Sequence, residues 1–148
     1  MEQTMPPVDP EGRAGRLVGQ YRRLLQAVLC EVLRAVERDP PGLERIARAV
    51  GLYFDTCFVR RRALRRLLLA LRDLSMEGEL LRSAPMFLLR ADLAKLGVAA
   101  PDATAESLMQ RVDQLRDREC AVDCPDPAAR ARLLELIRQM KLAEGQPA

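Results

Sequence analysis

The sequence predicts an all-α protein, a helical bundle of two long antiparallel helices with three or four shorter helices packed around them. Leucine dominates its apolar residues, and aromatic residues make up only 3% of the 148 residues. Leucine, alanine, arginine and glutamate lose little side-chain freedom in a helix, whereas the β-branched and aromatic residues that favour strands are sparse. Apolar residues also recur at alternating spacings of three and four, which places them on one face of a helix. Segments that alternate apolar and polar residues, the pattern of a half-buried strand, are almost absent.

The first helix is expected from Arg13 to Arg38. Its central apolar row keeps the helical spacing, and flanking leucines widen the face beyond the seam of a two-stranded coiled coil. The members of that row are Val18, Tyr21, Leu25, Val28, Val32 and Ala35. The sequence Asp-Pro-Pro-Gly at 39–42 ends the helix, because proline cannot continue the helical hydrogen bonds and restricts the residue before it. So broad an apolar face belongs in the core of a bundle.

The second helix is expected from Leu43 to Leu74, with Gly51 as its candidate bend. The connection before it is short, about four residues, which favours an antiparallel hairpin of the two long helices. The inner face of this helix is expected to consist of Leu43, Ile46, Val50, Tyr53, Phe54, Cys57, Leu64, Leu67, Leu68, Leu71 and Leu74.

Shorter elements follow the second helix. A helical turn is expected over 76–82, and then a helix over 85–96, with Pro85 at its first position and Gly97 as its C-terminal cap. Proline is common at the first helical position because its missing N–H has no helical partner there.

Two more helices complete the predicted bundle. Either Asp102 or Thr104 is expected to cap the first of them, which ends near Glu119. The last helix is expected to begin after Asp126, whose side chain caps it, and to end near Leu142. Both start signals are short polar side chains placed directly before an apolar periodic segment.

The predicted organisation is a single helical domain over 13–143. Residues 1–12 hold three prolines and three acids with no basic residue, which predicts a disordered N-terminal tail, and 144–148 form a C-terminal tail. The alternative division has two sub-bundles, 13–96 and 104–143, joined by the short connection between them.

The residue inventory offers little for catalysis or metal binding. There is no histidine, the commonest general base near neutral pH and the commonest metal ligand. The four cysteines lack CxxC spacing, and Cys120 and Cys124 would leave a zinc site short of ligands. No glycine-rich phosphate loop or nucleophile elbow occurs. The sequence therefore predicts a protein that is not an enzyme, without cofactor or metal.

The sequence predicts an intracellular protein, cytoplasmic or nuclear. Its longest uninterrupted apolar runs are four or five residues, so no transmembrane segment is expected. The first residues lack the apolar stretch of a secretory signal and the arginine-rich character of a mitochondrial presequence. Four cysteines without a signal peptide fit a reducing compartment better than a disulfide framework.

Charge is unevenly distributed along the chain, and positive charge is concentrated in one segment. Residues 1–75 have 14 arginines against nine acids, net +5, whereas 76–148 have ten basic residues against 12 acids, net −2. The segment Arg60–Arg72 alone contains six arginines and five leucines. On a helical wheel its leucines share one side, apart from Leu69, and the arginines occupy the neighbouring sector. The residues predicted to bind a partner are Phe58, Arg61, Arg62, Arg65, Arg66, Leu69 and Arg72.

The leading hypothesis is a non-enzymatic helical adaptor or subunit of a larger protein assembly. It would dock through its long N-terminal hairpin and its arginine-rich face onto a helical or acidic protein, with self-association as a further option. The same stretch contains an LxxLL docking pattern over 64–68, whose leucines we assign to the protein's own core.

Two alternatives stay open for the same strip. It would bind nucleic acid or an anionic membrane electrostatically through Arg60–Arg72. Nucleic acid is the less favoured of the protein's macromolecular partners, because neither aromatic stacking platforms nor a recognition motif is visible. Alternatively, the strip is a solvated face whose arginines pair with acids of the chain's second half.

Overall fold

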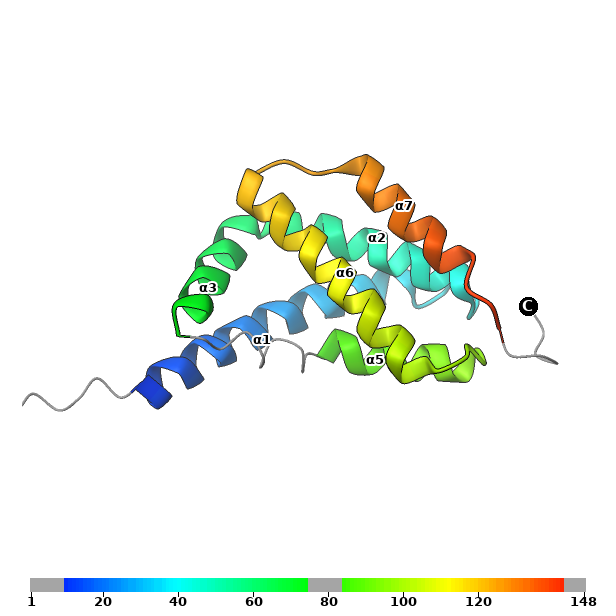
Figure 1. The fold of residues 1–148 in the computed structure, drawn as a ribbon, viewed down its shortest axis with the longest axis horizontal. Coiled ribbons are helices and arrows are strands. Elements are labelled where there is room, and N and C mark those ends of the chain that lie inside the picture. Colours follow the sequence, from blue (N-terminus) through cyan, green and yellow to red (C-terminus); the bar gives the residue numbers. More distant parts are fainter. Residues whose placement is uncertain (1–9, 75–83, 143–148) are drawn as a thin grey trace, which may run out of the picture.

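The computed structural model describes residues 10–74 and 84–142 of the chain. Those residues form six helices, with no strand beyond one isolated backbone bridge between Val98 and Leu142. The helices are α1 (Pro10–Val36), α2 (Leu43–Val59), α3 (Arg61–Asp73), α5 (Ala84–Lys95), α6 (Pro101–Val122) and α7 (Pro127–Arg138) (Figure 1). The all-α prediction is therefore confirmed. None of the helices in these two ranges is long and apolar enough to cross a bilayer.

Several sequence predictions fall largely outside the described residues. They are the helical turn over 76–82, the C-terminal tail over 144–148 and most of the N-terminal tail over 1–12. The last three residues of that N-terminal tail belong to α1, which begins at Pro10 and not at Arg13. Proline is compatible with this position, because the first N–H groups of a helix have no helical acceptor.

The second long helix was predicted wrongly as one element from Leu43 to Leu74. It is two helices, because α2 ends at Val59 and α3 begins after Arg60, whose φ of −102° and ψ of 21° interrupt the helix. The chain is helical through Gly51, the predicted bend. A Cβ placed there would lie 3.5 Å from the Leu134 side chain of α7, so this glycine marks a helix contact.

The start of α6 also differs from the prediction. Its N-cap is Ala100 in a left-handed conformation with φ of 46°, and Pro101 occupies the first helical position. Asp102 and Thr104, the predicted caps, therefore lie inside the helix. The hydroxyl of Thr104 donates to the carbonyl of Ala99 at 3.0 Å and does not cap the helical N–H groups.

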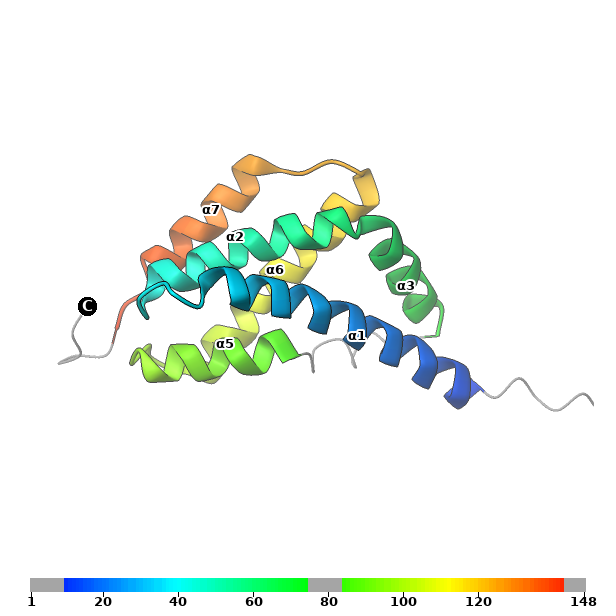
Figure 2. The ribbon, with the colours of Figure 1, turned by 180° about the vertical axis from the view of Figure 1, so that it is seen from behind.

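The helices pack around one hydrophobic core. α1 and α2 lie side by side and run in opposite directions, and α3 turns back from the end of α2 onto the N-terminal half of α1 (Figures 1 and 2). α6 contacts α2, α3, α5 and α7, while α7 covers α2 and α5 lies against α1 and α6. Every helix contributes to the core, whose fully buried side chains include Tyr21, Val28, Phe54, Leu64, Leu71, Leu93, Leu108, Val112 and Ile137.

Candidate functional site

Helix α3 has one buried face and one exposed, strongly basic face. Leu64, Leu67 and Leu71 are buried, so the LxxLL pattern over 64–68 belongs to the protein's own packing. The opposite side, which we call the arginine face, consists of the exposed residues Arg62, Arg65, Arg66, Leu69 and Arg72. Leu69 is 49% exposed, and at about 100° per residue it lies between the arginines.

The arginine face lowers the stability of the helix that presents it. α3 has no acidic residue in its first turn, where the positive end of the helix dipole disfavours cations. Arg62 precedes Arg65 and Arg66 by three and four residues, so like charges are neighbours, at a cost of about 0.2–0.5 kcal/mol per pair. Within residues 10–74 and 84–142, Arg62, Arg65, Arg66 and Arg72 make no ion pair. The described part of the fold therefore gains no ion pair in return.

The two arginines at the corner between α2 and α3 are used differently. Arg60 pairs with Glu31 of α1. Arg61 pairs with Asp123, directly after α6, and its guanidinium lies 4.5 Å from the centre of the Phe58 ring. Phe58 and Arg61 are both half-buried. Two of the seven predicted partner-binding residues are thus engaged within the chain, and the structure brings the other five together on the arginine face.

The N-terminal half of α1 adds further exposed cations at the same end of the molecule. Arg13, Arg16 and Arg23 are exposed, and none of them forms an ion pair with another described residue. Figure 2 shows α3 descending at an angle onto this half of α1, and the two helices are in contact. Two neighbouring helices therefore present arginines whose charge the described chain leaves uncompensated.

The connection between α6 and α7 is held by a buried ion pair. Nε and Nη2 of Arg130 donate to the two carboxylate oxygens of Glu119, each at 2.8 Å. Glu119 is only 2% exposed and also accepts from the backbone N–H of Asp126 at 2.8 Å. Nη1 of Arg130 donates to Asp55 of α2 at 2.6 Å. We call these four residues the α7 clamp.

A second ion pair, which is exposed, joins the C-terminal end of α7 to α2. Arg138 donates from Nε and Nη2 to the two carboxylate oxygens of Glu44, at 2.7 and 3.1 Å. This arrangement lowers the pKa of Glu44, first because the carboxylate accepts those hydrogen bonds. The arginines that orient α7 are therefore matched by acids of α2 and α6, unlike those of the arginine face.

A buried polar cluster joins α2 and α6. Arg116 is 2% exposed, and its Nη1 donates to the hydroxyl of Tyr53 at 2.8 Å. Its Nε donates to Asp117 at 2.9 Å, and Asp113 lies 3.1 Å from Nη1. Burial raises the pKa of Asp113 to about 6, although the guanidinium opposes the rise. We call Arg116, Tyr53, Asp113 and Asp117 the Arg116 cluster.

The Arg116 cluster is a structural network and does not have the properties of a reactive site. The neighbouring Cys57 thiol is buried, which raises its pKa to about 12, the opposite of what a nucleophilic thiol needs. Cys30, Cys57, Cys120 and Cys124 are all free thiols. In the described ranges, no three of the Cys, Asp and Glu side chains come together in a way that would hold a metal ion.

The α7 clamp and the Arg116 cluster were not singled out from the sequence, although a signal was available. Leu108, Val112 and Leu115 mark an apolar row of α6, and Glu119 continues that row at the same spacing. Arg116 lies one helical turn after Val112 and is also on the inner side. A charged residue at a position of an apolar row is expected to be buried with a partner.

No protein-family model, curated protein or solved structure matches this chain. The function is therefore inferred from the described residues themselves. Among the charged groups described above, the arginine face differs from the α7 clamp and the Arg116 cluster because its cations are exposed and have no acidic partner in the described chain.

Proposed function

We propose that this chain is a non-enzymatic helical adaptor or subunit of a larger assembly, which binds an acidic protein surface through the arginine face. One observation carries the proposal. Four arginines surround an exposed leucine on a helix whose other side is buried, and they lack the acidic partners that Arg130 and Arg138 of α7 have. An acidic partner would supply the missing counter-charges.

The exposed leucine favours a protein partner over a purely ionic ligand. Protein interfaces commonly combine an apolar centre with arginine, which forms planar, two-pronged contacts with carboxylates. Leu69 supplies such a centre, and the surrounding cations would steer an acidic surface toward it. Because the buried leucines fix α3 against the core, less conformational freedom would be lost on binding.

The long N-terminal hairpin has a supporting role in this proposal. α2 packs against α6 and α7, and α1 packs against α3 and α5, so the hairpin acts as the frame that positions α3. The partner is proposed to be helical or acidic, and an intracellular setting, cytoplasmic or nuclear, fits the four free thiols. Self-association is the variant in which a second copy provides the acidic surface.

Reversing the charges of the arginine face tests the proposal. A tagged Arg62→Glu/Arg65→Glu/Arg66→Glu protein and the parent would be compared in cells by cross-linking mass spectrometry. A matched control reverses three exposed arginines elsewhere, Arg34, Arg111 and Arg132. We expect a stoichiometric acidic partner, cross-linked close to α3, to be lost from the first variant and kept by the control. Equal recovery with all three proteins, or no stoichiometric partner of the parent, contradicts the proposal.

The second candidate is electrostatic binding of nucleic acid or an anionic membrane by the same face. The observation that favours it is the continuation of exposed arginines onto α1, at Arg13, Arg16 and Arg23. A salt titration of binding distinguishes the two. Several phosphate contacts would weaken binding about 10³-fold or more between about 50 and 200 mM salt, whereas an interface with an apolar centre should weaken far less.

A further inference from the structure

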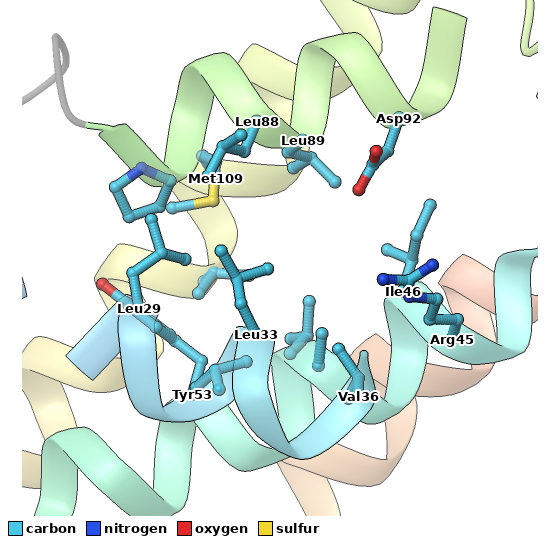
Figure 3. A pocket seen from close by; sticks show the side chains of 15 residues that line it. Leu29, Leu33, Val36, Arg45, Ile46, Tyr53, Leu88, Leu89, Asp92 and Met109 are labelled. Carbon is cyan, nitrogen blue, oxygen red and sulfur yellow. The ribbon is translucent and has the colours of Figure 1, made fainter. Parts of the chain in front are cut away.

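An apolar cavity lies between α1, α2, α5 and α6, away from the arginine face (Figure 3). Its enclosed volume is about 90 Å³, and it opens to solvent along one side. Figure 3 shows Leu88 and Leu89 of α5 on one side and Leu29 and Leu33 of α1 on the other. Leu33 and Leu88 are 38% and 41% exposed, so large apolar side chains from both sides stay in contact with water. This enclosed volume is below the range of about 300–1,000 Å³ that is usual for small-molecule sites, so a ligand would be enclosed only in part and would extend along the open side of the cavity.

One end of the cavity is charged. Arg45 of α2 and Asp92 of α5 line it there, and they are the charged side chains that line it among residues 10–74 and 84–142 (Figure 3). A smaller hollow continues from this end and is lined by both residues together with Lys95. Arg45 is half-buried, and among the described residues it makes no ion pair or side-chain hydrogen bond. Two cations and one carboxylate therefore surround the charged end.

We propose that this cavity binds a single-chain amphiphile with an aliphatic tail and a carboxylate head group. The tail would lie among the leucine, valine, isoleucine and methionine side chains and cover the exposed parts of Leu33 and Leu88. The carboxylate would lie at the charged end and accept hydrogen bonds from Arg45, with Lys95 nearby. This inference does not depend on the proposed role of the arginine face.

The charged end explains why the head group is assigned as anionic. A neutral tail would leave the half-buried guanidinium of Arg45 without a partner, whereas a carboxylate matches its planar donors. Asp92 opposes this arrangement, because it adds a negative charge on the same side. Because Asp92 and Arg45 have opposite charges, removing one or the other should change the affinity for the carboxylate ligand in opposite directions.

Binding of laurate, below its micelle concentration, would be measured by calorimetry on the full-length protein and on Arg45→Gln and Asp92→Asn. We expect Arg45→Gln to bind about tenfold more weakly, the loss of roughly one charge-assisted hydrogen bond, and Asp92→Asn to bind more tightly. The affinity for dodecanol, which has the same tail and no charge, should change little with either substitution. Equal effects of both substitutions on laurate, or tighter binding of dodecyltrimethylammonium than of laurate, would overturn the assignment of the head group.

A cavity-filling variant tests the location of the tail. Ala49 lines the cavity, and Ala49→Leu should abolish laurate binding, while Ala131→Leu on exposed α7 should not. Methyl NMR signals of Leu89 and Met109 should shift when laurate is added to the parent. The methyl spectrum of Ala49→Leu also reports whether the variant is folded. Absence of these shifts overturns the proposal. So do signals that change with protein concentration alone, because a second copy of the chain would then occupy the groove.

Discussion

The two ends of the molecule use the same residue type for opposite purposes. Around α7, the guanidinium of Arg130 has a carboxylate on each of two other helices, and burial of Glu119 excludes water from the pair. On α3, the four arginines of the arginine face point outward and meet no acid among the described residues. An excess of arginine in the composition therefore has no single meaning. Burial and partners decide whether an arginine stabilises the fold or is available to another molecule.

The largest expected effect comes from breaking the α7 clamp. Arg130→Ala would leave the carboxylate of Glu119 buried with a single backbone N–H donor, which typically costs about 3–5 kcal/mol. We expect the free energy of unfolding, measured by urea denaturation, to fall by that order. Arg65→Ala on the arginine face is the matched control and should change it by less than about 0.5 kcal/mol. Similar losses in the two variants would remove the distinction between the two ends.

The Arg116 cluster provides a prediction on pH. Burial raises the pKa of Asp113 from its ordinary 3.8 to about 6, so the folded state binds this proton more tightly than the unfolded chain. The resulting stabilisation is present below about pH 4 and is lost as the pH rises to about 6, a change of up to about 3 kcal/mol. Asp113→Asn cannot titrate, so its free energy of unfolding should fall less over this interval than that of the parent.

Urea denaturation at several pH values between 4 and 7 gives this comparison, and Asp117 remains as a partner of Arg116 in the variant. Parallel curves for the parent and Asp113→Asn would show that Asp113 does not titrate in this range.

Local signals in the sequence identified several helix ends correctly. Asp126 does cap α7, accepting from the N–H of Ala129 at 3.0 Å, and Gly97 follows α5 with a positive φ of 75°. The break at Arg60 has no such signal, because neither proline nor glycine is nearby, and the modest helix propensity of Phe58 and Val59 does not end a helix by itself. It arises from packing: the leucines of α3 reach α1 and α6 only if α3 turns away from α2.

The same limit applies to the candidate site. Helical periodicity grouped the arginines of α3 with Leu69 on one side, which is where they lie. It could not separate Arg61 from Arg62, because the partner that engages Arg61 is Asp123, 62 residues away in the sequence. The apolar cavity could not be predicted from the sequence either, since its lining comes from four helices and depends on their packing.

A smaller effect is expected at the contact between α2 and α7. Gly51 lies inside α2, where glycine is less favourable than alanine by about 0.5–1 kcal/mol. A Cβ there would meet Leu134 at 3.5 Å, an ordinary van der Waals distance. Gly51→Ala should therefore raise the free energy of unfolding by roughly this amount, as measured by urea denaturation. A loss would instead show that the two helices need the closer approach of glycine.

The smallest expected change in stability is the most informative about the arginine face. Arg62→Glu places an acid in the first turn of α3 and converts its repulsion with Arg65 and Arg66 into attraction, so we expect a gain of about 0.5 kcal/mol in the free energy of unfolding. The same substitution should weaken binding to an acidic partner, measured by titration calorimetry once the partner is known. Arg132→Glu on α7 is the control for a change of net charge.

Stability and affinity moving in opposite directions at position 62 would show that this cation is retained for recognition at the expense of the fold. If both rise, or if affinity is unaffected, the exposed arginines of α3 are a solvated face and the contrast with the α7 clamp has no functional content.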